Sequence, residues 1–384
     1  MPGLYLHIPF CVKKCAYCDF VSMPVEGMDG CSLNALKESY LGALRREIAA
    51  RKGEYENRAF DTVFFGGGTP SQMPCGFFSE LFGFLRENLN ITEGAEITVE
   101  CNPGTVTLQK AEEYAAVGIN RISLGLQSAN DSILRRIGRI HTLQQFDGCM
   151  SILKRAGFDN INADVMFGLP DQSMRDYIET LEYVCGVGVK HISAYSLILE
   201  ENTPLYRSVA AGEVTLPDAD LTADMQDAGI NFLESCGFRR YEVSNFAKAG
   251  FECKHNINYW ENGEFLGIGA AAHSAYRGEC GRLLRVENTS DVEQYIAGEY
   301  APCAVMELSR EDEMFDTVMM GFRMTNGIDT EAFWERFGCR IFERFGDRLN
   351  RLINCGLLEL SGSRLRATKR GFDILNYVLT ELMD

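Results

Sequence analysis

LYLHIPFCVKKCAYC, residues 4–18, places three cysteines directly after a short apolar run. The run Leu4–Ile8 is typical of a buried strand, and Cys11, Cys15 and Cys18 follow on the next loop in a C-x3-C-x2-C spacing. Three thiolates on one short loop can ligate three irons of a 4Fe-4S cluster and leave the fourth without a protein ligand. An open position on a metal is typical of chemistry rather than structure. The three cysteines are therefore predicted cluster ligands.

The competing interpretation of this loop is a structural zinc site. Zinc normally takes four protein ligands, so Asp19 or His7 would have to complete it. The chain has 14 cysteines among 384 residues, and the other eleven show no ligand spacing. Disulfide scaffolds are shorter and denser in cysteine, so we do not expect these eleven to form disulfides. Free cysteine behaves as a small hydrophobic residue, and we expect the eleven to be buried.

Outward from this loop, strand-like and helical stretches alternate. Helices are expected at about 33–51, 77–88 and 108–117. Repeated βα units imply a parallel sheet with right-handed crossovers, as an open or partial barrel or a doubly wound sheet. The six expected strands are 4–8, 62–65, 96–100, 121–125, 162–166 and 191–195.

Polar and glycine-rich residues follow the expected strands at corresponding ends. In both candidate folds chemistry collects at the carboxyl ends of the strands, so these residues point to one shared pocket. They are Pro9-Phe10-Cys11, Gly66-Gly67-Gly68-Thr69-Pro70, Glu100-Cys101-Asn102-Pro103, Gln127-Ser128, and Asp164 with Gly168-Leu169-Pro170.

The second half of the chain changes character. Residues 217–236 indicate an amphipathic helix, and 241–276 are rich in glycine and aromatics. Beyond residue 306, helices at 307–323, 330–337 and 340–354, a hairpin at 357–367 and a helix at 371–383 resemble a winged helix. Residues 307–384 carry a net charge of −3, which favours packing or partner docking over DNA binding.

Charge and hydropathy exclude several classes of function. The 37 Lys and Arg stand against 54 Asp and Glu, a net charge of −17, which disfavours nucleic-acid phosphates and polybasic lipid anchoring. Neither a signal-peptide pattern nor a run of about 18 apolar residues is present. We expect a cytoplasmic protein without a transmembrane segment, and peripheral membrane contact is left open.

The motifs in order resemble the radical S-adenosylmethionine (radical SAM) superfamily. Within it they resemble the oxygen-independent coproporphyrinogen III oxidase-like group. The resemblance covers almost the whole chain and implies a partial (β/α)6 TIM-like barrel over residues 1–200, a barrel-covering extension over 201–305, and a helical, winged-helix-like domain over 306–384. The motifs that carry it are YLHIPFC (5–11), GGGTP (66–70), ECNP (100–103), GLQS (125–128), GRIH (138–141) and DVMFGLP (164–170).

Two details favour the HemW haem chaperone branch of that group. The oxidase carries another cysteine two residues after the third cluster cysteine, where this chain has Phe20. The HNxxYW motif His255–Trp260 resembles the chaperone branch. This branch implies haem as cargo and haem-receiving proteins as partners, and a homodimer is left open. The alternatives are oxidative decarboxylation of coproporphyrinogen III, anaerobic haem degradation as by a radical methyltransferase relative, and a zinc-binding adaptor.

The resemblance also implies ligand-binding residues, while no catalytic residue is assigned. Tyr17, between two cluster cysteines, is expected to pack on the cluster or on the adenine of S-adenosylmethionine, or to be a plain core aromatic. A structural salt bridge between Arg139 and an acid is the competing interpretation for that residue. His7 and His141 are expected to hold loops, and Cys253 is an alternative thiolate for haem iron. The remaining S-adenosylmethionine residues are Tyr5, Gly67, Gly68, Thr69, Glu100, Gln127, Arg139 and Asp164, and the haem residues are His255, Tyr259 and Trp260.

Overall fold

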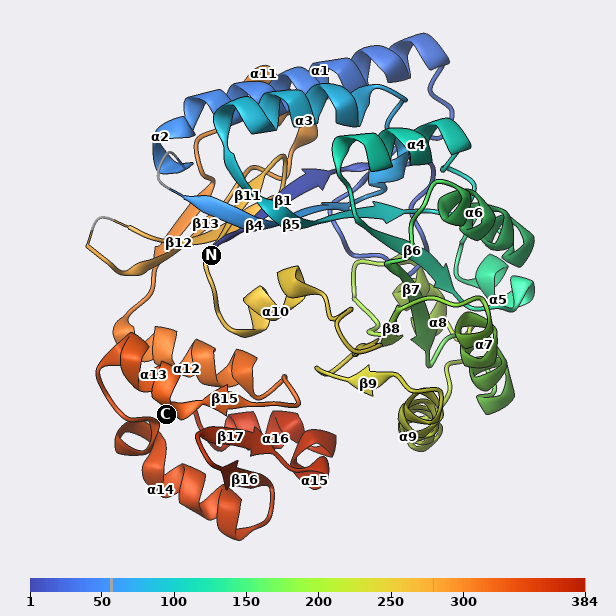
Figure 1. Ribbon diagram of the computed structural model, residues 1–384. Coiled ribbons are helices and arrows are strands. Elements are labelled where there is room, and N and C mark those ends of the chain that lie inside the picture. Colours follow the sequence, from blue (N-terminus) through green and yellow to red (C-terminus); the bar gives the residue numbers. More distant parts are fainter. Residues whose placement is uncertain (56–57, 279, 384) are drawn as a thin grey trace.

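The computed structural model describes residues 1–55, 58–278 and 280–383, and its centre is a run of parallel strands (Figure 1). Adjacent strands pair in parallel in chain order, so the expected partial barrel of six βα units is confirmed. The six strands are β1 (Gly3–Ile8), β4 (Ala59–Gly67), β5 (Asn90–Cys101), β6 (Arg121–Gln127), β7 (Ile161–Phe167) and β8 (His191–Ser196).

Helices between the strands cover the convex face of the sheet (Figure 1). All seven residues of β6 are buried, as expected for a parallel strand covered on both faces. Thr142 starts one helix with a capping box that ties its side chain to the amide of Gln145. The covering helices are α1 (Gly30–Ala50), α3 (Phe77–Asn88), α4 (Leu108–Val117), α6 (Leu143–Arg155) and α7 (Met174–Gly186), with the shorter α2 (Lys52–Tyr55), η1 (Pro70–Gln72) and α5 (Asp131–Arg136).

The region expected to cover the barrel lengthens the sheet at both edges. Two strands continue antiparallel beyond β8, and four more continue beyond β1, the first of them parallel to it. The added strands are β9 (Arg239–Arg240), β10 (Asn245–Ala247), β11 (Phe265–Ile268), β12 (His273–Arg277), β13 (Leu283–Glu287) and β14 (Ala304–Glu307). The helices of this region are α8 (Pro204–Ala210), α9 (Ala219–Ser235), α10 (Lys254–Trp260) and α11 (Val292–Ala297).

The C-terminal part has its own hydrophobic core, drawn from residues 314–382. The expected hairpin forms and gains a third strand, because β15 pairs with β17. The single helix expected over 371–383 is wrong: the backbone leaves helical geometry at Ile374 (φ −120°, ψ 38°) and two short helices result. The elements are α12 (Arg310–Gly321), β15 (Ile328–Asp329), α13 (Thr330–Phe337), α14 (Ile341–Asn354), β16 (Leu358–Ser361), β17 (Arg364–Ala367), α15 (Lys369–Asp373) and α16 (Leu375–Thr380).

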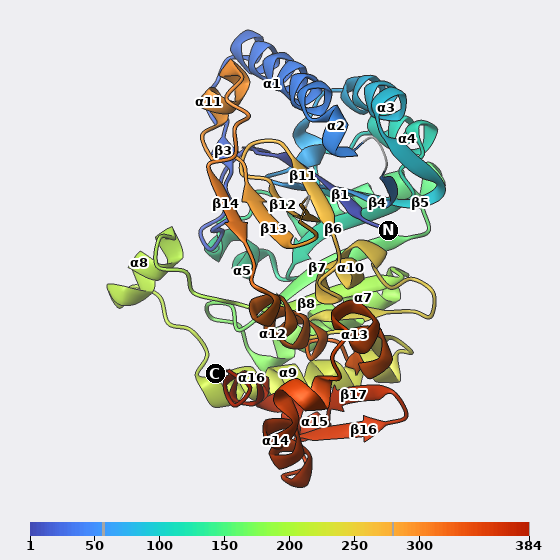
Figure 2. The same ribbon diagram turned by 90° about the vertical axis from the view of Figure 1, so that its left-hand side faces the viewer.

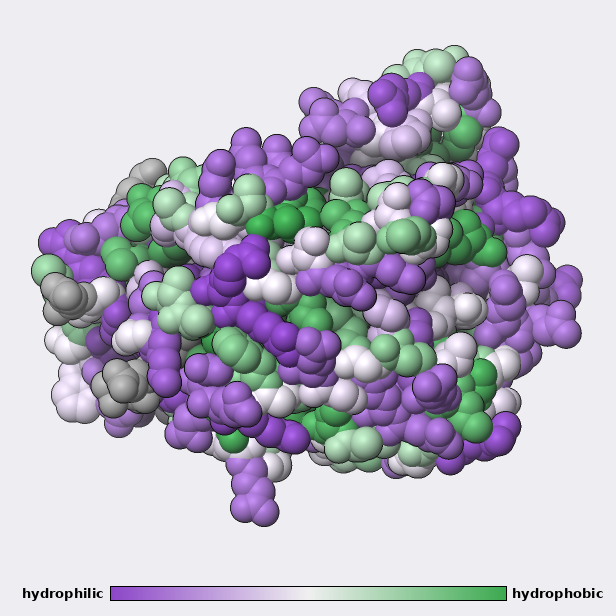
Figure 3. Space-filling model, turned by 90° about the horizontal axis from the view of Figure 1, so that it is seen from above, coloured by the Kyte–Doolittle hydropathy of each residue, from purple (hydrophilic) through white to green (hydrophobic). Residues whose placement is uncertain are grey.

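The short helix α10 lies on the concave side of the sheet, between β4 and the C-terminal part (Figures 1 and 2). On the opposite, helical side, hydrophilic residues interleave with smaller hydrophobic areas (Figure 3). No helix in the described ranges is both long and apolar enough to cross a membrane. His255 of α10 lies against Gly3 and Thr62, near the starts of β1 and β4, so this helix covers the amino end of the barrel.

The cysteines outside the loop only partly match the expectation of burial. Cys101, Cys149 and Cys253 are buried. Five others lie at the surface, because they occupy helix ends and loops rather than strands, so the expectation was wrong for them. These are Cys31, Cys75, Cys280, Cys303 and Cys355.

Candidate functional site

A pocket of about 560 Å³ opens at the carboxyl ends of the parallel strands. Every residue predicted for the cluster and for S-adenosylmethionine lines it except Tyr5. Tyr5 lines an adjoining chamber of about 220 Å³. This inner chamber shares six lining residues with the pocket: Phe20, Gly67, Glu100, Ser123, Asp164 and Tyr195. The pocket residues among those predicted are Cys11, Cys15, Tyr17, Cys18, Gly67, Gly68, Thr69, Glu100, Gln127, Arg139 and Asp164.

The cysteine loop is anchored at both ends and at its middle. Short strands β2 (Phe10–Cys11) and β3 (Met23–Pro24) pair in parallel around it. The amide of Ala16 donates to the carbonyl of Ile137 at 3.0 Å, which ties the loop to the end of α5. The Cys11 Sγ and Thr69 Oγ1 atoms lie 3.4 Å apart. Burial raises the pKa of the Cys11 and Cys18 thiols above the usual value.

The donor set fits a 4Fe-4S cluster. All three cysteines are free, partly exposed and turned to one pocket. Within residues 1–55, 58–278 and 280–383, no three His, Cys, Asp or Glu side chains converge on a point where one metal ion could be held. A 4Fe-4S cluster places its thiolates on different irons, so thiols spread around a pocket match its needs.

Two glycines let the second strand approach the first. Gly67 has φ +110°, and an added Cβ would lie 2.6 Å from the His7 ring. A Cβ on Gly68 would lie 2.6 Å from the backbone of Pro9. Both positions therefore require glycine, and the backbone that results is open to a ligand.

The Arg139 side chain links the cysteine loop to the carboxyl ends of β5 and β6. Its Nη2 donates to Asn102 Oδ1 at 2.6 Å and to the Gly125 carbonyl at 2.8 Å, while Nη1 lies 3.6 Å from Cys15 Sγ. The expected alternative, a salt bridge to an acid, is not formed among the described residues. Within the described part of the chain the Arg139 Nε and the Gln127 Oε1 are buried without a hydrogen-bond partner, which fits a pocket that binds a polar ligand.

Two carboxyl groups, Glu100 and Asp164, lie where the pocket meets the inner chamber. Burial, followed by the charge of Asp164, raises the pKa of Glu100 to about 8. Burial also raises the pKa of Asp164, which accepts from Asn162 at 2.7 Å and from Ser123 at 3.4 Å. A buried acid whose neutral form is favoured by desolvation can lose its proton and ionise beside a cationic ligand.

Tyr5 and His7 connect the inner chamber to the loop that bears Phe20. The His7 Nε2 lies 2.9 Å from the Val21 carbonyl, which can only accept, so this nitrogen carries the proton. The His7 Nδ1 then accepts from the Tyr5 hydroxyl at 3.1 Å. His7 therefore holds the loop as expected.

Tyr17 is a partly buried aromatic of the pocket wall, and its packing on the cluster or on adenine stays a prediction. Its side chain packs against the small apolar cluster of Ile133, Ile137, Met166 and Leu169, and it also lines the pocket. His141, near Arg139 in sequence, is buried beside the Leu126 backbone. Burial lowers the pKa of His141 to about 3.

The HNxxYW motif lies at the other end of the barrel, on α10. His255 is 1% exposed, and both ring nitrogens are engaged, Nδ1 with Thr62 Oγ1 at 2.8 Å and Nε2 with the Tyr259 hydroxyl at 2.9 Å. Burial lowers its pKa to about 3. The structure therefore does not bring His255, Tyr259 and Trp260 together with the cysteines.

A buried carboxylate fixes the start of α10. The Glu96 side chain accepts from the amides of Lys254 and His255 at 3.1 Å and lies 3.5 Å from Cys253 Sγ. Burial raises the pKa of Cys253 to about 12, so this thiol is an uncharged part of the barrel end.

Sequence reasoning assigned no role to several polar residues of the site. Asn102 orients Arg139, and Asn162 with Ser123 orients Asp164. Arg121 is almost fully buried beside the inner chamber, and its Nε has no partner within the described part of the chain. The sequence signal for Asn102 is its place directly after a strand. For the residues on strands, the signal is the two-residue alternation of side chains, which turns Ser123 of β6 and Asp164 of β7 to the interior of the barrel.

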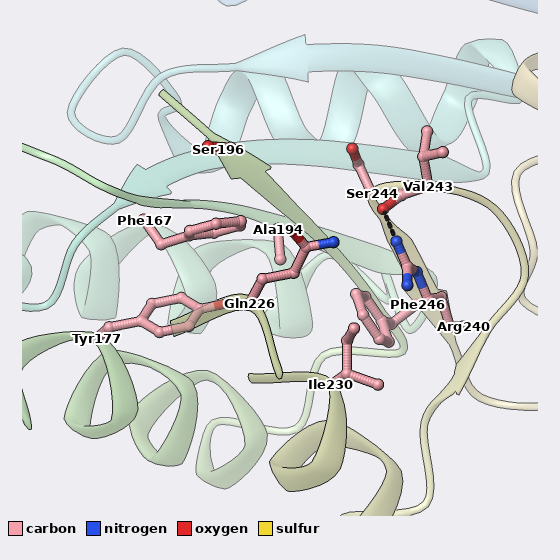
Figure 4. A pocket seen from close by; sticks show the side chains of 10 residues that line it. All are labelled: Phe167, Tyr177, Ala194, Ser196, Gln226, Ile230, Arg240, Val243, Ser244 and Phe246. Atoms are coloured by element: carbon pink, nitrogen blue, oxygen red, sulfur yellow. Dashed lines mark hydrogen bonds between the residues drawn. The ribbon is translucent and has the colours of Figure 1, made fainter. Parts of the chain in front are cut away.

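A second cavity of about 150 Å³ lies between β8, β10 and α9 (Figure 4). Aromatic and aliphatic side chains such as Phe167, Tyr177 and Ile230 line much of it. Arg240, its one charged lining residue, donates to the backbone carbonyls of Glu242 and Val243. No predicted site residue lies here.

Two family models match the chain: the radical SAM superfamily over residues 5–184 and the HemN C-terminal domain over residues 308–374. Haem chaperone HemW of Lactococcus lactis is 34% identical over 381 residues, covering 99% of this chain and 96% of that protein. The HemW of Escherichia coli is 35% identical over 378 residues, covering 98% and 97%.

The fold is also similar to that of a solved structure over nearly the full length. Coproporphyrinogen III oxidase (HemN) from Escherichia coli, a radical SAM enzyme, superposes with a TM-score of 0.84 over 99% of this chain and 90% of that chain. Its sequence identity is 22%, so the likeness concerns the fold.

Proposed function

Because the chain belongs to the HemW family of haem chaperones within the radical SAM superfamily, we propose that it binds haem and delivers it to haem-requiring proteins. Identity of 34–35% along almost the whole of both chains carries this proposal. Phe20, at the place of the extra cysteine of the oxidase, supports it. The oxidase shares the fold, and fold alone does not assign a reaction.

The pocket supports a 4Fe-4S cluster and S-adenosylmethionine as cofactors. Cys11, Cys15 and Cys18 would ligate three irons, and a cluster of this kind supplies single electrons to S-adenosylmethionine when both are bound. Glu100 and Asp164 would accept from its ammonium or hydroxyl groups, while the Arg139 guanidinium can fork onto its carboxylate. Gly67, Gly68 and Thr69 would border its aminoacyl end, with Gln127 and Tyr17 beside it.

A haem contact at His255, Tyr259 or Trp260 stays a prediction from the family resemblance. In the folded chain His255 is bonded on both ring nitrogens, so iron ligation there would require α10 to give up its bonds to Thr62 and Tyr259. Haem-receiving proteins as partners and a homodimer likewise remain proposals. We propose that the receiving proteins dock on the surface of the C-terminal part.

The test separates the chaperone from the oxidase. The cluster is reconstituted anaerobically, and haem or coproporphyrinogen III is added with S-adenosylmethionine and a reductant. We expect stoichiometric haem binding and transfer to an apo-haem protein, with coproporphyrinogen III unchanged. Formation of protoporphyrinogen would overturn a chaperone-only function, and failure to bind haem would overturn the proposal itself.

A further inference from the structure

A buried arginine lies in the barrel interior without a hydrogen-bond or ion-pair partner among the described residues. Arg121, the first residue of β6, is 2% exposed, and its Nε is one of the buried polar atoms that no group of the described chain satisfies. Its nearest acids, Glu96 and Asp164, act on it through their charges without forming an ion pair. A guanidinium stays charged and carries five N–H donors, so its burial without a partner is costly. Arg121 therefore points to a ligand that pairs with it.

The strand register turns Arg121 toward the inner chamber. On β6, Ile122 and Leu124 belong to the hydrophobic core, whereas Ser123 lines the chamber on the same side as Arg121. The Cα partner of Arg121 on β5 is Thr98, whose Oγ1 is also buried without a partner in the described chain. Two neighbouring strands thus bring unsatisfied polar atoms to the same level of the barrel.

The walls around the arginine combine neutral polar groups with aromatic rings. Asn162 and Ser193 are bonded to each other at 3.2 Å and form one wall. Asn256 of α10 also lines the chamber, and its side-chain amide has no hydrogen bond among the described residues. The rings of Tyr5 and Phe64 supply apolar surface. At about 220 Å³, the chamber is smaller than the sites of about 300–1,000 Å³ that hold drug-sized ligands, so it suits a small molecule.

The charges of the chamber favour a carboxylate over other anions. Glu100 and Asp164 lie at the boundary with the cluster pocket, so a phosphate with two charges would meet two acids with one arginine to balance it. A carboxylate carries a single charge, and its two oxygens match the parallel N–H groups of a guanidinium.

We propose that the inner chamber binds a small carboxylate, held by the Arg121 guanidinium at the amino end of the barrel. The Asn256 amide adds a hydrogen bond, and the rings of Tyr5 and Phe64 favour an apolar or aromatic body on the ligand. This site adds a second small ligand below the proposed S-adenosylmethionine site. It is independent of the proposed haem function, because none of its contacts involves haem.

Benzoate is the probe, because it joins one carboxylate to a flat apolar ring. Saturation-transfer NMR and the melting temperature of the full chain, with its cluster reconstituted, are measured with benzoate, with its neutral counterpart benzamide and with inorganic phosphate at constant ionic strength. We expect benzoate to bind about tenfold or more tightly than either of the other two and to raise the melting temperature.

Two variants test the residues of the site. Arg121→Met removes the guanidinium and keeps a side chain of similar length, so benzoate binding should fall about tenfold or more. Its melting temperature without ligand should equal or exceed that of the wild type, because an unpaired buried charge is lost. Ser193→Val narrows the chamber while keeping Arg121, and it should weaken benzoate binding as well. This second variant decides the question if Arg121→Met does not fold.

Arg240→Met is the matched control. Arg240 lies at the second cavity and donates to the carbonyls of Glu242 and Val243, so its loss should lower the melting temperature and leave benzoate binding unchanged.

Four outcomes would overturn the proposal. One is a wild-type chain that does not bind benzoate, and another is equal affinity for benzoate and benzamide, which would show no recognition of the carboxylate. Tighter binding of phosphate than of benzoate would contradict the assigned ligand class. Benzoate binding that persists in a folded Arg121→Met chain, or in Ser193→Val, would place the carboxylate elsewhere.

Discussion

The rings of Phe64 and His255 stack at 24° with their centroids 5.1 Å apart. Phe64 also stacks on Tyr5, with ring centroids 6.3 Å apart, and Tyr5 is hydrogen-bonded to His7. A continuous line of rings therefore joins the HNxxYW helix at one end of the barrel to the cysteine loop at the other. His255 takes part in this line through its packing, with both nitrogens already engaged.

Replacing His255 by alanine should destabilise the fold. The change leaves Thr62 and Tyr259 without their shared partner and opens a cavity, so we expect the free energy of unfolding to fall by about 3 kcal/mol. Tyr259→Phe removes one bond and should cost about 1 kcal/mol. Urea unfolding measures both. A His255→Ala chain as stable as wild type would contradict the structural role described here.

Each of Cys11, Cys15 and Cys18 should be required for the cluster. Serine at any one of them removes a thiolate ligand, and anaerobic reconstitution should then yield little iron or sulfide and weak visible absorbance. Cys31→Ser and Cys75→Ser, at exposed positions, serve as controls and should load normally. A full cluster in any of the three loop variants would remove that residue from the ligand set.

Gly67 should tolerate alanine less well than another left-handed glycine. Gly76 has φ +91° with open space around it, so Gly76→Ala should cost only backbone strain, about 1 kcal/mol. Gly67→Ala adds the clash with the His7 ring and should cost about 1–3 kcal/mol more. Parallel denaturant curves measure the difference, and equal costs would show that the ring moves aside freely.

Arg139→Lys should weaken S-adenosylmethionine binding although the charge is kept. A lysine ammonium cannot reach Asn102, Gly125 and the ligand together as the planar guanidinium does. We expect the dissociation constant to rise about tenfold or more, measured calorimetrically on the reconstituted protein. Arg136→Lys, at an exposed ion pair with Asp171, is the control and should bind normally.

Glu100 should make stability fall as the pH rises. Its folded pKa of about 8 lies above the usual value of 4.5, so the folded state favours the protonated form. The stability it contributes is complete below about pH 4.5 and is lost as the pH rises through about 8, by an amount on the order of a few kcal/mol. Asp164, Arg121 and Tyr5 face Glu100 and shape this titration.

Glu100→Gln isolates that contribution, because glutamine stays neutral. Urea unfolding at pH 5, 7 and 8 should show the variant gaining on the wild type as the pH rises. A constant difference across this range would mean that Glu100 does not titrate there.

The barrel was predictable because each strand carries its own short signal. The cluster loop follows Leu4–Ile8 directly, and the carboxyl ends of parallel strands meet at one edge, so the pocket assembled as expected. The environment of His255 was not predictable from its motif. The i, i+4 spacing indicates that His255 and Tyr259 share a helix face, but only the packing of α10 against β4 decides that this face is buried.

The helix α10 is shared between two parts of the molecule. The helix is bonded to the barrel and also contacts the C-terminal part. The Arg323 guanidinium lies over the Trp260 ring. Just after the helix, Asn262 donates to Thr317 and its carbonyl accepts from Arg336. Arg323, Thr317 and Arg336 all belong to the C-terminal part. A chain cut before residue 306 would lose these contacts to α10, the helix at the amino end of the barrel. The C-terminal part therefore helps to hold the barrel closed and cannot be deleted without loss of structure.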